Sequence, residues 1–123
     1  MTCRIEVSTP GRGFTEITGE LRQSLRSSGV QTGLLHVFIR HTSASLLLTE
    51  NADPDVRHDL ETFISRLAPD GDPAHIHSAE GPDDMPAHIR SVLTSSELSL
   101  PIRDGNLALG TWQGVYLWEH RHR

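Results

Sequence analysis

The chain has 123 residues, enough for one domain spanning residues 1–123, and its formal net charge is −5. Arginine supplies all of the basic side chains, and the pI is about 5.8. Domains that bind nucleic acid usually carry a basic patch and a pI above about 9, so we expect no nucleic-acid partner. No apolar run approaches the roughly 20 residues that span a bilayer. Cys3 is the one cysteine and no signal peptide is visible, so we expect a cytoplasmic protein with no membrane partner.

The N-terminal segment predicts two strands and a helix. Residues 2–8 alternate between apolar and polar side chains, as a half-buried strand does, and residues 14–17 form a second short strand. Residues 18–28 follow as a helix, with Thr18 as its N-cap and Gly29 in the left-handed position that ends it.

Two continuous apolar runs come next and predict buried strands at residues 33–39 and 46–51, on either side of a polar segment. Asp53 then stands as an N-cap before Pro54, which suits the first position of a helix. Apolar side chains recur on one face as far as Leu67, so this is the clearest amphipathic helix in the chain.

The second half begins with a loop at residues 69–82 that is longer than most connections between elements. An acidic, proline-marked start predicts a third helix within residues 83–93. Residues 98–109 read as a hairpin around the turn Asp104-Gly105, and residues 115–118 as a strand buried on both faces.

Together these elements favour an α+β fold with a mixed, mostly antiparallel sheet and about three helices on one of its faces. A sheet of this size needs cover on its other face, and self-association would provide it.

Four histidines are candidate metal ligands, because imidazole is the commonest neutral metal ligand in proteins. A catalytic zinc site uses three protein ligands and leaves a fourth position open. His75 and His77 are two residues apart, so in extended backbone their side chains point the same way. His88 follows an acidic helix start that could orient its second ring nitrogen, and His41 ends a buried strand. The spacing matches neither HExxH nor CxxC, so scattered surface histidines are the alternative.

Polar side chains elsewhere suggest an anion site and proton carriers. Thr42 and Ser43, with the nearby Arg40, could hold a phosphate, although no glycine-rich phosphate loop is present. The alternative is that these hydroxyls satisfy the end of a strand. Glu50 follows a buried strand and could act as a general base, whereas Asp84 could either cap a helix or move a proton.

Three segments together resemble one known family. They are HTSASLLLTEN at residues 41–51, DDMPAHIRSVL at residues 83–93 preceded by His77, and LPIRDGNLALGTWQGVYLWEHR at residues 100–121. In this order the chain is similar to the YjbQ-type family, the secondary thiamine-phosphate synthase group, from roughly residue 33 onward. The resemblance implies a small α+β protein that assembles as a homotrimer. It also implies a weak enzymatic activity that joins a phosphorylated pyrimidine and a phosphorylated thiazole to give thiamine phosphate.

By the same resemblance, His41, His77 and His88 approach one another, within one chain or across a subunit boundary, and bind a divalent metal. Imidazole ligands suit zinc better than magnesium, so zinc is the expected ion. The family's GTWQ segment falls on residues 110–113 and its acidic strand end on Glu119.

The first hypothesis is therefore a metal-dependent enzyme, a thiamine-phosphate synthase or a hydrolase or transferase of another small phosphorylated metabolite. Its candidate catalytic residues are Glu50, Asp84, Gln113 and Glu119, and its candidate substrate ligands are Arg40, Thr42, Ser43, Arg90 and Trp112. The alternative is a purely structural role, with Trp112 anchored in the core and Glu119 at a solvated strand end. The second hypothesis is a non-catalytic trimeric protein that binds a metal or a small anion, which a closed shell of four ligands would favour.

Overall fold

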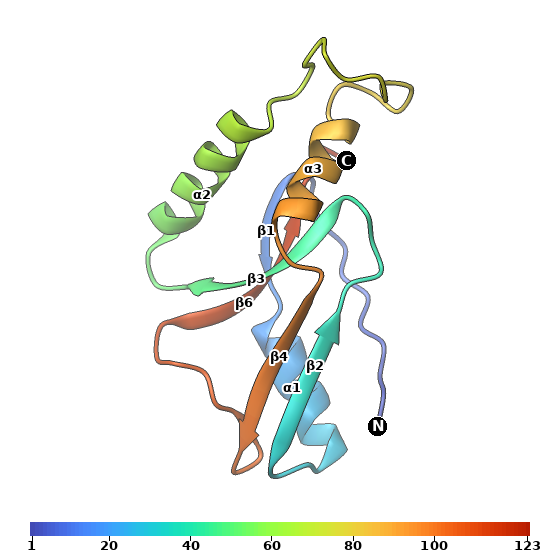
Figure 1. Ribbon diagram of the computed structural model, residues 1–123. Helices are drawn as coiled ribbons and strands as arrows, with labels where there is room; N and C mark the ends of the chain where they lie inside the picture. The colour runs from blue at the N-terminus through green and yellow to red at the C-terminus, as the bar shows by residue number, and fades with distance from the viewer.

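The computed structural model describes residues 1–123 and contains three helices and six strands (Figure 1). In chain order the elements are β1 (Gly13–Glu16), α1 (Thr18–Ser28), β2 (Gly33–Phe38), β3 (Ala44–Glu50), α2 (Pro54–Leu67), α3 (Asp84–Leu93), β4 (Glu97–Arg103), β5 (Asn106–Leu107) and β6 (Gln113–Glu119). The mixture of helices with antiparallel strands confirms the α+β class.

The strands form two three-stranded sheets, β1-β6-β3 and β2-β4-β5, in which all neighbours are antiparallel. This corrects the expectation of one mixed sheet. The sheets meet where the Leu46 N–H of β3 donates to the Ser95 carbonyl (2.7 Å), just before β4. β6 takes the centre of its sheet because its apolar run can be buried on both faces: Val115, Tyr116 and Trp118 are at most 3% exposed.

Residues 2–8 form no strand, so the prediction from their alternating pattern was wrong. A strand needs a partner for its backbone N–H and C=O groups, and no other segment of the chain pairs with this one. Only Val7 packs against the core, and Ile5 is 37% exposed. Alternation alone therefore did not determine the structure here.

The two long helices begin differently. α2 begins as predicted, because the Asp53 side chain accepts a hydrogen bond from the Asp55 N–H (2.9 Å) and Pro54 follows it. α1 has Ile17 at its N-cap, and Thr18 lies inside the helix. Thr18 Oγ1 instead accepts a hydrogen bond from the Val115 N–H of β6 (2.8 Å), so a tertiary contact replaces the local cap.

The core lies between α1 and both sheets. Its members are Ile17, Leu21, Leu25, Leu46, Leu100, Ile102, Leu107 and Val115. Fully burying one side chain of this kind stabilises a fold by about 1.5–3 kcal/mol. The core thus joins β3 and β6 of one sheet to β4 and β5 of the other, which holds both sheets in one domain.

The helices are divided between the two ends of the molecule, which corrects the expectation that all three cover one face. α1 contacts β5 and β6 and lies behind β2 and β4, whereas α3 contacts β3 and lies with α2 at the other end (Figure 1). The outer face of β2 is left uncovered: Leu34 is 71% and Phe38 60% exposed. None of the three helices is long and apolar enough to cross a membrane.

Candidate metal centre

Three side chains that can bind a metal converge at the start of α3. His77 Nε2 lies 2.7 Å from Asp84 Oδ2, and His88 Nε2 lies 3.1 Å from the same oxygen. Ligand atoms of all three residues lie within 4.8 Å of one another. Asp84 and His88 are four residues apart, so one face of α3 presents both, and the loop after α2 brings His77 to them.

The Asp84 carboxylate is nearly buried, with 7% of its side chain exposed. Burial by itself would raise its pKa, but the hydrogen bond from His77 and the charges of His88 and Arg121 outweigh burial and lower it. Asp84 is therefore ionised at neutral pH, which is the form that binds a metal.

The His88 ring is oriented by the backbone. Its Nδ1 lies 2.9 Å from the Thr42 carbonyl oxygen, which can only accept a hydrogen bond, so Nδ1 carries a proton. Nε2 is the nitrogen that faces Asp84: in the charged ring it donates to the carboxylate, and in the neutral ring it offers the lone pair that a metal would use. Metal-binding histidines commonly donate their other N–H to a carbonyl or carboxylate in this way.

This arrangement fits a divalent transition metal. In a tetrahedral site with metal–ligand bonds of about 2.0–2.1 Å, neighbouring ligand atoms lie roughly 3.3 Å apart. The two nitrogen-to-oxygen distances in this cluster are 2.7 and 3.1 Å, so a small outward movement of the three side chains would admit an ion. Two imidazoles and one carboxylate are ligands that zinc accepts and magnesium seldom selects.

His41 is not part of this cluster. Its Nδ1 accepts a hydrogen bond from the Ser43 N–H (3.0 Å), and a backbone N–H can only donate. The neutral ring therefore carries its proton on Nε2. In this conformation neither nitrogen of neutral His41 offers a free lone pair. The third side chain that could hold a metal is therefore Asp84, for which the sequence suggested a catalytic role.

A family model described as UPF0047 protein YjbQ-like matches residues 3–123. The chain belongs to this family. The UPF0047 protein sll1880 of Synechocystis is 52% identical over 117 residues, which cover 95% of this chain and 80% of that protein. YjbQ of Salmonella typhimurium is 50% identical over 118 residues, which cover 95% and 85%. The crystal structure of the conserved hypothetical protein TT1486 from Thermus thermophilus matches with a TM-score of 0.88 at 39% identity, over 99% of this chain and 93% of that one.

In this YjbQ-like chain, the pairing of β3 with β6 separates the expected catalytic residues into two groups. Ala44 pairs with Glu119 at one end, beside Thr42, and Glu50 pairs with Gln113 at the other. Six steps along a strand span about 20 Å, so Glu50 and Gln113 lie far from the metal centre within one chain. Glu50 Oε2 accepts from the Asp53 N–H (2.8 Å), and Gln113 Oε1 accepts from the Gly110 N–H (2.7 Å).

The expected substrate ligands differ in how far they are exposed to solvent. Arg40 and Thr42 are exposed, as is Trp112, which lies at the Glu50 end and is 63% exposed. Ser43 is buried beneath His41. Trp112 is therefore a surface residue of the single chain and not a core anchor.

Arg90 belongs to the interior. It is fully buried, and its guanidinium contacts Glu61 Oε2 (2.9 Å) and Ser65 Oγ (2.8 Å). Glu61 Oε1 also accepts from the indole N–H of Trp118 (3.1 Å). Arg90 thus links α3 to α2 within the chain, and this placement leaves no surface on which it would meet a substrate.

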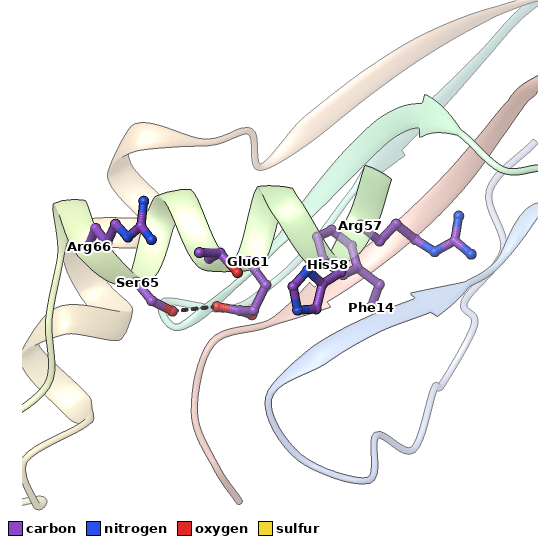
Figure 2. Close-up of a pocket in the computed structure, with 7 residues that line it drawn as sticks. Phe14, Arg57, His58, Glu61, Ser65 and Arg66 are labelled. Carbon is purple, nitrogen blue, oxygen red and sulfur yellow. Dashed lines mark hydrogen bonds between the residues drawn. The ribbon is translucent and has the colours of Figure 1, made fainter. Parts of the chain in front are cut away.

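Several hollows lie on the surface near these residues. A groove of about 610 Å³ runs along α2 and is lined by Phe14, Arg57 and Ser65 among others; none of the cluster residues lines it (Figure 2). A pocket of about 360 Å³ opens beside the metal centre and is lined by His77, His75 and Met85 among others. This pocket is lined by a residue of the cluster, His77, so a small molecule in it would lie beside a metal held there.

Sequence reasoning missed Arg121 and did not predict the burial of His120. Arg121 Nη1 lies 3.2 Å from Asp84 Oδ1, and no local pattern connects residues so far apart in the chain. His120 is fully buried and its Nε2 lies 2.8 Å from Ser45 Oγ. Here a signal was available, because His120 continues the alternation of Tyr116 and Trp118 toward the inner face of β6.

Proposed function

We propose that the chain is a small metal-dependent enzyme that holds one divalent transition metal, with zinc preferred over magnesium, through His77, Asp84 and His88. The observation that supports this most directly is the orientation of His88. Its Nδ1 is committed to the Thr42 carbonyl, so its Nε2 is directed at a carboxylate that also contacts a second imidazole.

Three protein ligands leave a fourth position open, as in catalytic zinc sites. A metal in this position supplies Lewis-acid chemistry, polarising a phosphoryl or carbonyl oxygen or lowering the pKa of a bound water. The chain adds His41, whose Nε2–H can donate to an anionic oxygen, one residue from the Thr42 backbone that holds His88. The pocket beside His77 provides space for a small substrate.

For the substrate we propose a small phosphorylated metabolite, because a metal held by the cluster and the N–H of His41, next to the Thr42 that contacts His88, would both favour phosphoryl oxygens. The resemblance drawn from the sequence adds thiamine-phosphate synthesis as the first reaction to assay. Neutralising a pyrophosphate leaving group is a role that magnesium fills better than a histidine-bound ion. Hydrolysis or transfer of a phosphoryl group is therefore the nearer chemical match.

The assembly we propose is a homotrimer. The outer face of β2 exposes Leu34 and Phe38, and β2 pairs with a neighbour on only one of its edges. Apolar side chains on an open strand edge are typical of a surface that another chain covers. A non-catalytic trimer that binds a metal or an anion is the second candidate function, and a fourth protein ligand on the metal would favour it.

The decisive experiment is metal analysis of untagged protein, comparing the wild type with His88→Ala and with His58→Ala. His58 lies on α2 with 76% of its side chain exposed, so it controls for loss of any histidine. We expect close to one equivalent of zinc or another transition metal in the wild type and in His58→Ala, and none in His88→Ala. No metal in the wild type, even after reconstitution with zinc, would refute the metal centre.

A further inference from the structure

The C-terminal residues pack against the start of α3, where Arg121 contacts the Asp84 carboxylate of the candidate metal centre. The guanidinium of Arg121 contacts three groups there: Asp84 Oδ1 through Nη1 (3.2 Å), Asp83 Oδ1 through Nη2 (3.3 Å) and the Glu80 carbonyl through Nη2 (2.6 Å). One planar group therefore ties two adjacent carboxylates to the turn that precedes the helix.

The segment that carries Arg121 is itself held on both sides. Before it, the His120 ring is fully buried, and the His120 N–H donates to the Ser43 carbonyl (3.1 Å). After it, the His122 N–H donates to Asp83 Oδ2 (3.0 Å). Arg12 Nε adds a bond to the His120 carbonyl (2.7 Å). Arg121 thus approaches Asp84 from a fixed backbone and not from a free tail.

The two oxygens of the Asp84 carboxylate have different partners. Oδ1 contacts Arg121, whereas Oδ2 contacts His77 and His88. Because a carboxylate is planar, holding Oδ1 determines where Oδ2 points. Without the contact to Arg121, the side chain could rotate about χ2, a broad torsion for aspartate, and carry Oδ2 away from the imidazoles.

We propose that Arg121 is a positioning residue of the metal centre: it holds Asp84 Oδ1 so that Oδ2 stays aimed at the site shared by His77 and His88. The inference rests on the proposed metal-binding function and adds to it a residue that does not touch the metal. Outer partners of this kind typically change metal affinity about 10–100-fold when they are removed.

Charge alone predicts the opposite result, which makes the inference testable. Arg121 is a cation beside the place where a divalent cation would bind, so simple Coulomb repulsion predicts that its removal tightens binding. Positioning predicts that removal weakens binding. The sign of the change therefore separates the two effects.

The experiment measures Co²⁺ and Zn²⁺ binding to metal-free protein by calorimetry, and the visible absorption of bound Co²⁺, which reports the geometry of its ligands. The variants are Arg121→Gln and Arg121→Lys, and the control is Arg123→Gln, which removes the same charge from an exposed residue two positions away. We expect Arg121→Gln to weaken binding about 10–100-fold and to change the Co²⁺ spectrum. Lysine keeps the charge but cannot bridge two carboxylates, so we expect it to weaken binding as well, while Arg123→Gln matches the wild type.

Circular dichroism confirms that each variant is folded. If Arg121→Gln does not fold, Asp83→Asn serves in its place, because it loosens Arg121 without touching Asp84; we expect severalfold weaker binding. Wild-type protein that binds neither ion refutes the metal centre and the inference together. Wild-type protein that binds, with Arg121→Gln binding equally or more tightly, overturns only the role of Arg121.

Discussion

Protonation of His120 should make the fold sensitive to mild acid. The His120 ring is fully buried, packs 5.0 Å from the Trp118 ring, and has its Nε2 against Ser45 Oγ. Burial, and then the positive charges of Arg90 and Arg12, lower the pKa of His120 from 6.5 to about 3. The folded protein therefore keeps this ring neutral at pH values where the unfolded chain would protonate it.

The direction of the effect follows from proton binding. Below pH 6.5 His120 binds a proton in the unfolded chain, whereas in the folded protein it stays neutral until about pH 3. The free energy of unfolding therefore falls as the pH drops from 6.5 to about 3. Each pH unit in this range lowers the free energy of unfolding by about 1.4 kcal/mol. Between pH 7 and pH 5, allowing for the partial titration near pH 6.5, His120 should reduce the free energy of unfolding by about 2 kcal/mol.

Urea unfolding at pH 7 and pH 5 tests this with the wild type and His120→Gln. Glutamine does not titrate, and the other seven histidines are common to both proteins. The loss of stability between the two pH values should be about 2 kcal/mol smaller in the variant, even though the variant is less stable overall. An identical loss in both proteins would refute the argument. Because His120 anchors the segment that carries Arg121, acid should also loosen the metal centre.

Three further outcomes are expected. Asp84→Asn should weaken zinc binding about 100-fold or more because one of three ligands is lost, whereas His41→Ala should change it less than about threefold; calorimetry showing the reverse order would make His41 the ligand. Glu61→Ala should lower the free energy of unfolding by roughly 3–5 kcal/mol, because the buried charge of Arg90 loses its carboxylate partner and keeps only the neutral Ser65 Oγ. A loss below about 1 kcal/mol in urea denaturation would show that Arg90 finds another negative charge. Phe38→Glu on β2 should reduce an assembly of three times the 13.6 kDa chain mass to single chains in light scattering, and a wild-type protein already at 13.6 kDa would rule out the trimer.

Local patterns in the sequence predicted the elements that are determined by residues close together in the chain. Asp53 and Pro54 begin α2 where they were expected to, because a cap and its helix are neighbours in the chain. The turn at Asp104-Gly105 joins β4 and β5, and both residues have the positive φ values, 52° and 75°, that such a hairpin needs. The apolar run of β6 became the central strand of its sheet for the same reason, since its own composition requires burial on two faces.

The positions of two of the three candidate metal ligands could also be predicted in this way. Asp84 and His88 lie one helical turn apart, so their common face follows from the period of the helix. The sequence therefore supported a helix with a carboxylate and an imidazole side by side. It did not distinguish a ligand from a proton carrier, because that role depends on what the carboxylate faces.

Only the tertiary structure decided the rest. Residues 2–8 carry the pattern of a strand but find no partner, His77 reaches Asp84 through a long loop, and Arg121 reaches it from the end of the chain. The length, composition and periodicity of this sequence determined its class, its helices and its central strand. The contacts that orient the candidate metal ligands join segments far apart in the chain, and their geometry exists only once both sheets and α3 have packed together.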